Sequence, residues 1–331
     1  FYKSDGVFGI MANVLATYVI LFVLFGAFLE KSGAQRFFID YPLAAVGHRI
    51  GGPAKVSVIA SGLFGSISGS AIANTVSTGA FTIPMMKKAG FRPHIAGGIE
   101  PAASISGMFM PPIMGAGGFI MAELTGVPYS RIMLVAIFPA IMYVFSVFVM
   151  VHYEAKKYNI KGEKSEHSAT EILKTQWYYT MPLVVITILM LYGFSPGYSA
   201  ILGIVTCIVI SWFKKDTRIT PKRFIEASRA GTENSLKIGA TVGVIGIIIG
   251  VLTYSGLVLT FADIVIELAS GAVFGGIDFR LVATIFLIAL ASLVLGMGVP
   301  VTAAYLITAV VAVPALIHLG VNEIAAHMIV Y

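Results

Sequence analysis

Long uncharged apolar runs dominate the chain and predict helices that cross a membrane. Each run extends over roughly 20 residues, enough to span about 30 Å of hydrocarbon at about 1.5 Å per residue. The runs do not show the alternation of about ten residues per strand that is typical of an outer-membrane barrel. We therefore predict α-helical spans near residues 7–29, 131–151, 177–193, 197–213 and 237–261.

Two charged connectors orient these spans. Lysine and arginine cluster in residues 152–175 and 214–230, and such clusters remain on the cytoplasmic side of a membrane. The turn at 193–197, between the two spans that separate the connectors, is uncharged and fits the opposite side. The charge pattern and the span count therefore agree, and both connectors are predicted to be solvated cytoplasmic loops.

Two further apolar segments are predicted to enter the membrane and return to the same side. Residues 51–88 have Lys or Arg at both ends, which indicates entry from the cytoplasm, and their glycine-, serine- and threonine-rich middle cannot face lipid. We expect a re-entrant helical hairpin with its tip near 66–75. Residues 279–318, with a tip at 296–302, have no excess of Lys and Arg at their ends and are expected to enter from outside.

A shift of 230 residues places the first half of the chain on the second without gaps. Pro84 falls on Pro314 and Gly90 on Gly320, and both halves share the order of span, semi-polar linker, hairpin and proline. Because the hairpins are expected to enter from opposite sides, the sequence predicts an inverted repeat, which is typical of secondary transporters. The predicted divisions are a first repeat at 1–152, two connecting spans with cytoplasmic loops at 153–235, and a second repeat at 236–331.

Tandem prolines interrupt what would otherwise be one overlong span at 93–124. Pro111 and Pro112 remove two backbone donors and free carbonyl groups around 106–109. Together with the polar groups of the first tip, these carbonyls form a hard, neutral, oxygen-rich set that suits Na⁺ better than a transition metal. The alternative is that the small residues only let helices pack closely. The polar tip residues are Ser66, Ser68, Ser70 and Asn74.

Four acidic residues lie within apolar segments, where an ionisable group is a functional candidate. Glu100 precedes the prolines in the same segment. It either faces a cavity, where it tunes cation affinity or carries a proton, or pairs with a Lys or Arg at the hairpin base. Glu123 is expected near the outer interface. Asp263 and Glu267, four residues apart in 260–276, indicate a helix lying along that interface.

The composition agrees with a membrane protein and argues against an enzyme. Hydrophobic residues make up 57% of the 331 positions and charged residues 11%, less than half the charged share that is usual in a soluble domain. Cys207 is the single cysteine, so no disulfide framework and no thiol-based metal site are expected. The chain has no His-Glu-x-x-His motif and no phosphate-binding loop, and we predict no enzymatic activity.

Three short motifs occur in order along the chain: FGSISGSAIANT at 64–75, MPPIMGA at 110–116 and GMGVPVTAAY at 296–305. In this combination they resemble the large membrane subunit of a tripartite ATP-independent periplasmic (TRAP) transporter. Within that family the chain most resembles the fused membrane component that works with TAXI-type substrate-binding proteins. The resemblance covers the whole chain.

The resemblance implies an elevator-type secondary transporter in a bacterial or archaeal cytoplasmic membrane, driven by a Na⁺ gradient. It would receive an organic anion or amino acid from a periplasmic TAXI-type binding protein and work with a small membrane subunit or its fused equivalent. The implied first Na⁺ site comprises Ser68, Ser70, Asn74, Gly107 and Met110, and the partial second site comprises Gly296, Val299 and Thr302. The candidates for the substrate cavity are Ser66, Thr75, Pro111, Pro112, Gly298, Pro300 and Glu100.

The family pattern is expected to extend beyond both ends of the chain. Its second helix break, with paired prolines, would fall near position 341, and further helices would precede Phe1. Two alternatives stay open: a divalent-anion/sodium symporter of related hairpin architecture that needs no binding protein, and a membrane subunit of a proton-translocating complex. The latter normally carries a line of intramembrane Lys, Glu and His, whereas the broken segments here are rich in Ser, Asn, Thr and Gly.

Overall fold

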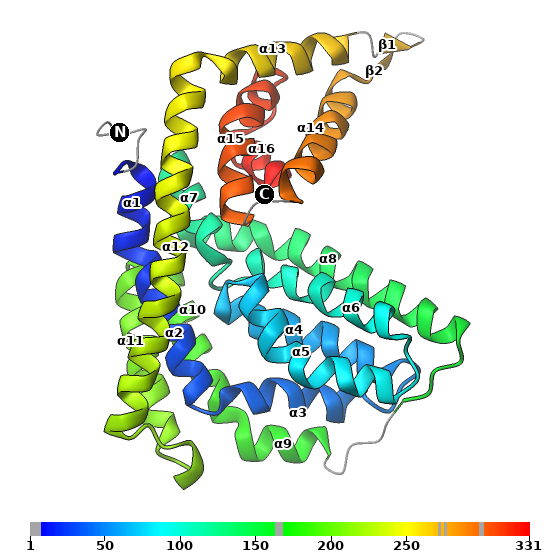
Figure 1. Ribbon diagram of the computed structural model, residues 1–331, viewed down its shortest axis with the longest axis vertical. Coiled ribbons are helices and arrows are strands. Elements are labelled where there is room, and N and C mark those ends of the chain that lie inside the picture. The colour runs from blue at the N-terminus through cyan, green and yellow to red at the C-terminus, as the bar shows by residue number, and fades with distance from the viewer. Residues whose placement is uncertain (1–7, 163–167, 271–272, 275–276, 298–300) are drawn as a thin grey trace. The chain divides into compact units, whose positions relative to one another are not determined.

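The computed structural model describes residues 8–162, 168–270, 273–274, 277–297 and 301–331, and these residues are almost wholly helical (Figure 1). The α-helices are α1 (Ile10–Val14), α2 (Ile20–Lys31), α3 (Ala34–Val46), α4 (Gly52–Ser68), α5 (Ala71–Lys88), α6 (Pro93–Ile105), α7 (Gly115–Thr125), α8 (Tyr129–Lys157), α9 (Ala169–Gln176), α10 (Met181–Leu191), α11 (Pro196–Ser211), α12 (Pro221–Ser255), α13 (Leu257–Ser270), α14 (Arg280–Gly296), α15 (Val301–His318) and α16 (Glu323–Val330).

Short elements of other kinds interrupt or join these helices. The π-helical turn η1 (Leu15–Val19) links α1 to α2, and the 3₁₀ turns are η2 (Ser106–Met108), η3 (Trp177–Thr180) and η4 (Lys215–Thr217). Two-residue strands, β1 (Val273–Phe274) and β2 (Ile277–Asp278), pair in antiparallel register. Apart from this strand pair, the expected all-α fold is confirmed for the described residues.

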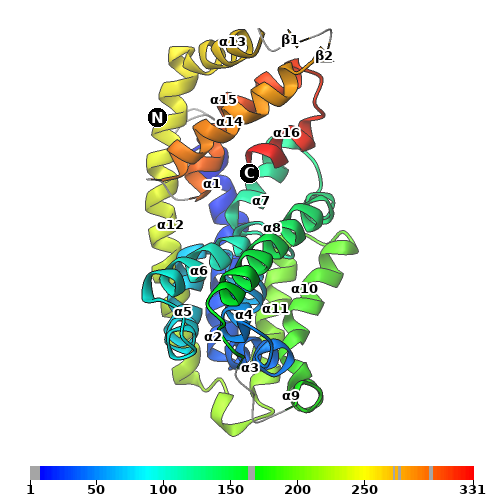
Figure 2. The same ribbon diagram turned by 90° about the vertical axis from the view of Figure 1, so that its right-hand side faces the viewer.

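The chain divides into two compact units. One comprises residues 18–118 and 129–235. In it α4, α5 and α6 pack on one another, α4 also contacts α3 and α8, and α11 packs on both α10 and α2 (Figures 1 and 2). The other comprises residues 1–17, 119–128 and 236–331, and in it α15 packs on α13, α14 and α16. The helices that carry the candidate site belong to the first unit.

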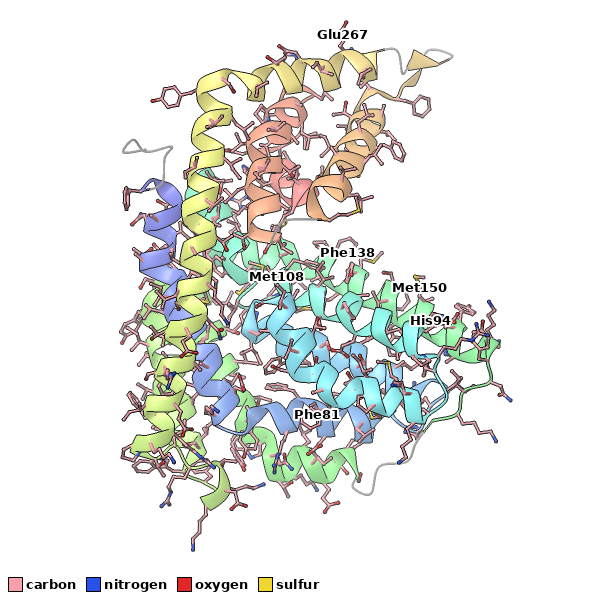
Figure 3. The ribbon with its side chains drawn as sticks, viewed as in Figure 1. Phe81, His94, Met108, Phe138, Met150 and Glu267 are labelled. Atoms are coloured by element: carbon pink, nitrogen blue, oxygen red, sulfur yellow. The ribbon has the colours of Figure 1, made fainter. Side chains whose placement is uncertain are left out.

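Among the described residues, three helical segments are long and apolar enough to cross a membrane: Ala12–Lys31, Tyr129–Lys157 and Pro221–Leu252. They match three of the five predicted spans. On α8 the apolar side chains of Phe138 and Met150 are each 73% exposed and project outwards (Figure 3), as expected for a surface that contacts lipid.

The other two predicted spans, at 177–193 and 197–213, correspond to shorter helices. Residues 177–180 form the turn η3, so that α10 keeps only Met181–Leu191, and α11 covers Pro196–Ser211. A 16-residue helix such as α11 is about 24 Å long, less than the usual hydrocarbon thickness. The uncharged residues between α10 and α11 form the predicted tight turn, in which Gly193 has a φ of 85°.

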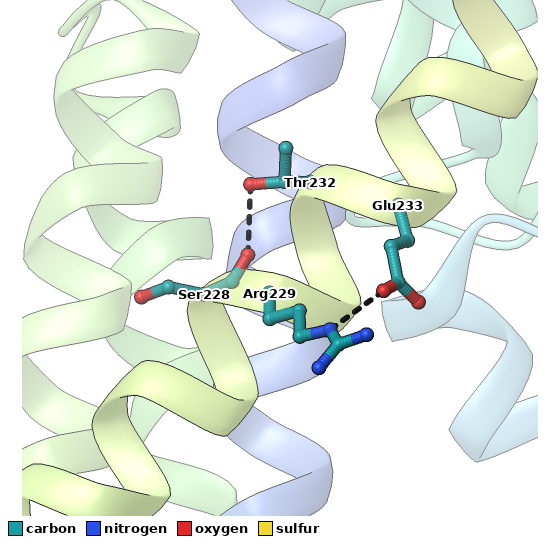
Figure 4. Close-up of polar contacts among 4 residues, drawn as sticks. All are labelled: Ser228, Arg229, Thr232 and Glu233. Carbon is teal, nitrogen blue, oxygen red and sulfur yellow. Dashed lines mark hydrogen bonds and ion pairs between the residues drawn. The ribbon is translucent and has the colours of Figure 1, made fainter.

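Much of the two charged connectors is helical, where we had predicted loops. α8 continues to Lys157, α9 lies within the first connector, and α12 already begins at Pro221. Arg229 and Glu233, one turn apart on α12, form an exposed ion pair with 2.8 Å between Nε and Oε1 (Figure 4). Pairing at this spacing is compatible with a helix and stabilises it only slightly, and the polar start of α12 continues directly into its apolar part.

The segment at 51–88 folds as two packed helices, α4 and α5, joined by Gly69 and Ser70. Gly69 has a φ of 58°, a left-handed conformation that costs glycine no steric strain. Ser70 caps α5, since its Oγ accepts a hydrogen bond from the Ala73 amide at 3.3 Å. The turn therefore lies inside the predicted tip region.

The interruption predicted within residues 93–124 is confirmed. α6 ends at Ile105, the single turn η2 follows, and α7 starts at Gly115. The second apolar segment forms α14 and α15, but residues 298–300 of its expected tip lie outside the described residues. The helix expected at 260–276 is α13, which ends at Ser270.

A glycine sets the distance between α11 and its neighbours. A Cβ atom at Gly203 would lie 2.5 Å from Cδ1 of Ile186 on α10 and 3.0 Å from Cε2 of Phe25 on α2. Both distances are shorter than van der Waals contact, so the helices can approach this closely only because position 203 has no side chain.

We expect Gly203→Val to lower the free energy of unfolding by about 1–3 kcal/mol, because the added methyl groups must displace Ile186 and Phe25. The measurement is denaturation of the purified protein in detergent. Gly97→Val on α6 is the matched control, since a Cβ there meets no atom within 4 Å. Equal destabilisation by the two variants would contradict the close packing of α11.

Candidate functional site

The turn between α4 and α5 lies directly against the break in the α6–α7 segment. A Cβ atom at Gly65 would lie 2.6 Å from the Cα of Gly107 in η2, so these two backbones are in contact. The amide of Ile113 donates a hydrogen bond to the carbonyl of Ser66 at 3.3 Å. Tertiary packing thus brings together the two sequence regions that were predicted to share a cation site.

Asn74 joins three helices near this contact. Its side chain is fully buried, and Nδ2 donates to the carbonyl oxygens of Ser61 on α4, at 2.7 Å, and Ser104 on α6, at 3.2 Å. The amide oxygen Oδ1 has only a long contact, 3.4 Å, from the hydroxyl of Thr78. Both hydrogens of the side-chain nitrogen are therefore used in hydrogen bonds to α4 and α6, while the side-chain oxygen can still accept a further hydrogen bond or bind a cation.

The other members of the predicted first Na⁺ site lie on the tip and the break. Gly107 contacts Gly65, which also lies beside Nδ2 of Asn74, so Asn74 and Gly107 are close together. Ser68 and Ser70 lie at the turn, with 3.5 Å between Oγ of Ser68 and the backbone of Ser70. The carbonyls around 106–109 were predicted to be free. The Ser106 carbonyl is not, because it accepts a hydrogen bond from the amide of Met110 at 2.9 Å.

The candidates for the substrate cavity near the tip have local partners. Ser66 Oγ donates to the Leu63 carbonyl at 2.7 Å, and Thr75 Oγ1 donates to the Ala71 carbonyl at 2.8 Å, both within their own helices. Pro111 and Pro112, joined by a cis peptide bond, follow η2 in the break.

Two tyrosines of α8 brace the break, and the sequence reasoning did not identify them. The hydroxyl of Tyr129 lies 2.5 Å from the Ile113 carbonyl and 2.9 Å from the Pro112 carbonyl, and the hydroxyl of Tyr143 donates to the Ala102 carbonyl at 2.9 Å. Tyr129 thus supplies a donor to backbone carbonyls within the break, and Tyr143 to one in the last turn of α6, as buried backbone requires.

Glu100 is fully buried, and five hydroxyl groups surround its carboxylate. The described residues include no Lys, Arg or His that forms an ion pair with it, so the basic partner considered from the sequence is not observed. Hydroxyls approach Oε1 from Ser61, at 2.7 Å, Thr78 and Ser104, at 3.3 Å, and approach Oε2 from Ser57, at 2.5 Å, and Thr82.

The hydroxyl partners of Glu100 occur as pairs at helical spacing. Ser57 and Ser61 are four residues apart on α4, Thr78 and Thr82 are four apart on α5, and Glu100 itself precedes Ser104 by four residues on α6. Residues at this spacing share one face of a helix. This repeated spacing was the sequence signal that our prediction missed.

The second predicted Na⁺ site is only partly described. Gly296 at the end of α14 is exposed, and Thr302 in the first turn of α15 is partly buried. Val299, together with the cavity candidates Gly298 and Pro300, lies outside the described residues. Further along α15, the buried hydroxyl of Tyr305 lies 2.9 Å from Nδ1 of His327 on α16.

Neutral groups dominate this site. The contacts between the turn and the break come from backbone amides and carbonyls and from the amide of Asn74, and no cluster of three or more His, Cys, Asp or Glu suited to a metal occurs in the part of the chain that the structure describes. Neutral oxygen ligands suit a hard cation such as Na⁺. The fold and the site therefore define a membrane-associated helical protein with a broken helix packed on a helix pair.

Comparison with known families identifies the group. The family described as "Tripartite ATP-independent periplasmic transporter, DctM component" matches residues 5–331, so the chain belongs to the DctM family of TRAP transporter components. This is a family of transport proteins and not of enzymes.

Individual relatives agree with this assignment. The chain is 26% identical to a putative TRAP transporter large permease protein of Haemophilus influenzae over 58% of this chain and 45% of the relative. It is 28% identical to the 2,3-diketo-L-gulonate TRAP transporter large permease protein of Escherichia coli over 43% and 33%, and 26% identical to the sialic acid TRAP transporter permease protein of Haemophilus influenzae over 59% and 32%. The matches thus span less than half the length of these relatives.

We expect Gly65→Ala to lower the free energy of unfolding by about 1–3 kcal/mol, because a methyl group there would push the backbone of Gly107 away. Gly62→Ala, one turn earlier on α4, is the matched control: its Cβ would lie 3.8 Å from its nearest neighbours, an ordinary contact. Denaturation of both purified variants in detergent tests the expectation. If Gly65→Ala is no less stable than Gly62→Ala, the contact between the turn and the break is wrong.

Proposed function

We propose that the chain forms part of the permease subunit of a secondary transporter that is driven by a sodium gradient and depends on a substrate-binding protein. The main support is the position of Asn74, whose nitrogen binds two carbonyl groups between the hairpin and the broken helix while its oxygen retains acceptor capacity. An oxygen held at such a junction is suited to bind a dehydrated Na⁺. Membership of the DctM family supports the transport function.

The proposed cargo is an organic anion or amino acid. Relatives are named for sialic acid, 2,3-diketo-L-gulonate and C4-dicarboxylates, all of which are organic anions. Backbone amides at the start of α5 and hydroxyls of the tip are groups that hold a carboxylate. The cavity candidates are Ser66, Thr75, Pro111, Pro112, Gly298 and Pro300. Glu100 is not proposed to line the cavity, because it is fully buried and five hydroxyls enclose its carboxylate.

The proposed partners are a periplasmic substrate-binding protein of the TAXI type and a small membrane subunit or its fused equivalent. The family description, a tripartite periplasmic system, supports a binding protein and a further membrane component. The proposed location is the cytoplasmic membrane of a bacterium or archaeon. Support comes from the three helices, in the part of the chain that the structure describes, that are long and apolar enough to cross a membrane.

We also propose the inverted repeat with two re-entrant hairpins and an elevator-type movement. At an offset of 230 residues α5 and α15 have the same length and bounds, and α6 and α16 begin at matching positions. Gly90 and Gly320, with φ values of 107° and 85°, occupy corresponding turns. These local correspondences support a shared ancestral unit, and the charge pattern supports opposite entry of the two copies.

We expect Asn74→Ala to reduce Na⁺-driven substrate uptake about tenfold or more, because it removes a cation ligand and leaves two buried carbonyls without their donor. The assay uses the complete transporter with its binding protein in proteoliposomes. Thr206→Val is the control, since that hydroxyl only contacts the Leu202 carbonyl of its own helix at 2.8 Å. Unchanged Na⁺ dependence of Asn74→Ala would refute the first-site assignment.

The proposed topology is tested by cysteine labelling. Lys88 and His318 are both exposed and end the two corresponding helices α5 and α15, so cysteines there should react with an impermeant reagent from opposite sides of the membrane. Lys161→Cys marks the cytoplasmic side, and the buried Cys207 is replaced by alanine. Labelling of Lys88→Cys and His318→Cys from the same side would rule out the inverted arrangement.

A further inference from the structure

Glu100 is the one acidic residue between positions 52 and 114, the stretch that contains the hairpin and the break. The five hydroxyls around it come from three helices, and the hydroxyls of Ser57 and Ser104 have no other hydrogen bond among the described residues. Hydroxyl groups that converge on a buried carboxylate stabilise its negative charge. The five hydroxyls are thus placed to donate to an ionised Glu100, although those of Thr78 and Thr82 also lie within hydrogen-bond distance of a carbonyl of their own helix.

No cation in the vicinity neutralises this charge. Lys55 is the basic residue of α4 near the hydroxyl pair, but its Nζ lies 3.0 Å from Nδ1 of His152 and 5.2 Å from the centre of the Phe148 ring on α8. Within the described part of the chain no basic side chain pairs with Glu100. A buried and unpaired negative charge attracts a cation strongly, because the surroundings screen it weakly.

The carboxylate is connected to Asn74 by residues that contact both. Ser61 and Ser104 each direct a hydroxyl to Glu100 and a carbonyl to Nδ2 of Asn74. Thr78 adds a third link, since its hydroxyl contacts both Glu100 and the Asn74 carbonyl. One layer of residues therefore separates the carboxylate from the proposed first cation site.

The carboxylate is unsuited to bind the cation directly. The hydroxyl oxygens of Ser57 and Ser61 lie only 2.5 Å and 2.7 Å from its oxygens, and this spacing is that of hydrogen bonds. A cation between two oxygens would hold them much further apart, since each metal–oxygen distance is itself about 2.3–2.6 Å for an ion of this size. Glu100 must therefore act on the site at a distance.

The second half of the chain has no equivalent charge. At an offset of 230 residues, Glu100 corresponds to Val330, and the corresponding positions of three of its hydroxyl partners are apolar. The hydroxyl of Thr308, which corresponds to Thr78, donates to the Ala304 carbonyl of its own helix at 2.7 Å. The apolar positions that correspond to Ser57, Ser61 and Thr82 are Leu287, Ala291 and Ala312.

We propose that Glu100 is the fixed counter-charge of the first cation site: a positioning residue that binds no ion itself but raises the affinity for the cation held by the neutral ligands around Asn74. This inference rests on the proposed sodium-coupled function. All proposed ligands of that site are neutral, so a negative charge one layer of residues away would strengthen cation binding there. The counter-charge serves the first site and not the second.

The test is the Na⁺ dependence of uptake by the complete transporter in proteoliposomes. We expect Glu100→Gln to raise the half-saturating Na⁺ concentration about ten- to thirtyfold, because it removes the attraction between two charges separated by one layer of residues. The maximal rate at saturating Na⁺ should be largely retained. Glu100→Asp, which keeps the charge, should return the half-saturating concentration towards that of the wild type.

Two controls separate the effect of charge from that of packing. Ser57→Ala removes a hydrogen bond to Glu100 but keeps the charge, so its half-saturating Na⁺ concentration should stay close to that of the wild type. Glu123→Gln removes an exposed acidic charge on α7 and should also leave this concentration unchanged. A shift for Ser57→Ala as large as that for Glu100→Gln would overturn the proposal, because packing would then explain both.

A second variant guards against loss of folding. Glu100→Gln removes an acceptor from several hydroxyls at once and can leave the Ser57 hydroxyl without a hydrogen bond, because Glu100 is its partner. The variant is therefore also combined with Ser57→Ala, which removes that hydroxyl. Binding of Na⁺ to this purified variant, measured by thermal shift, should be weakened about tenfold or more relative to Ser57→Ala alone.

The outcomes distinguish the inference from the function on which it rests. If the wild-type transporter shows no Na⁺ dependence, the proposed sodium coupling is wrong and the counter-charge fails with it. If the wild type depends on Na⁺ but Glu100→Gln has an unchanged half-saturating concentration, whatever its maximal rate, only the counter-charge proposal is overturned.

Discussion

Burial of the Glu100 carboxylate constrains how α4, α5 and α6 pack in the first unit. A buried charge is tolerated only when hydrogen bonds replace the lost water, and here the donors come from α4, α5 and α6 together. A rotation or slide of one helix would remove donors from the carboxylate. The register of the three helices is therefore tied to this contact, and the position of Asn74 follows from that register because Ser61 and Ser104 serve both groups.

Contact between the helix pair α4–α5 and the break also requires that their backbones pack closely, in addition to the hydrogen bonds around Glu100 and Asn74. Gly65 and Gly107 let the helix pair touch the break, and Gly69 allows the turn to approach Gly115, where a Cβ would come within 2.7 Å of backbone. Backbone carbonyls in the break and in the last turn of α6 take hydroxyl donors from Tyr129 and Tyr143 of α8. The junction thus combines small residues, which give proximity, with hydroxyl groups, which satisfy the polar backbone.

The two halves of the chain combine similar local geometry with different interiors. Helices α5 and α15 share length and proline position, since the local signals of glycine turn and proline are common to both. The positions that form the carboxylate network in the first half are mainly apolar in the second, where packing of residues such as Leu306 and Leu316 needs no buried charge. The glycine and proline positions thus give the two helix pairs similar lengths and turns, while their buried side chains make the interior polar in the first half and apolar in the second.

The sequence by itself determined the apolar helices, the turn at Gly69 and Ser70, and the break around Pro111 and Pro112, because hydropathy, glycine and proline act within a few residues. It predicted loops where charged residues continue as helix in α12, since a high content of charged residues does not by itself prevent a helix that continues into an apolar one. Only the tertiary structure decided the partners of Glu100 and the bracing tyrosines. The hydroxyls that reach Glu100 lie up to 43 positions away along the chain, so their convergence depends on how three helices pack.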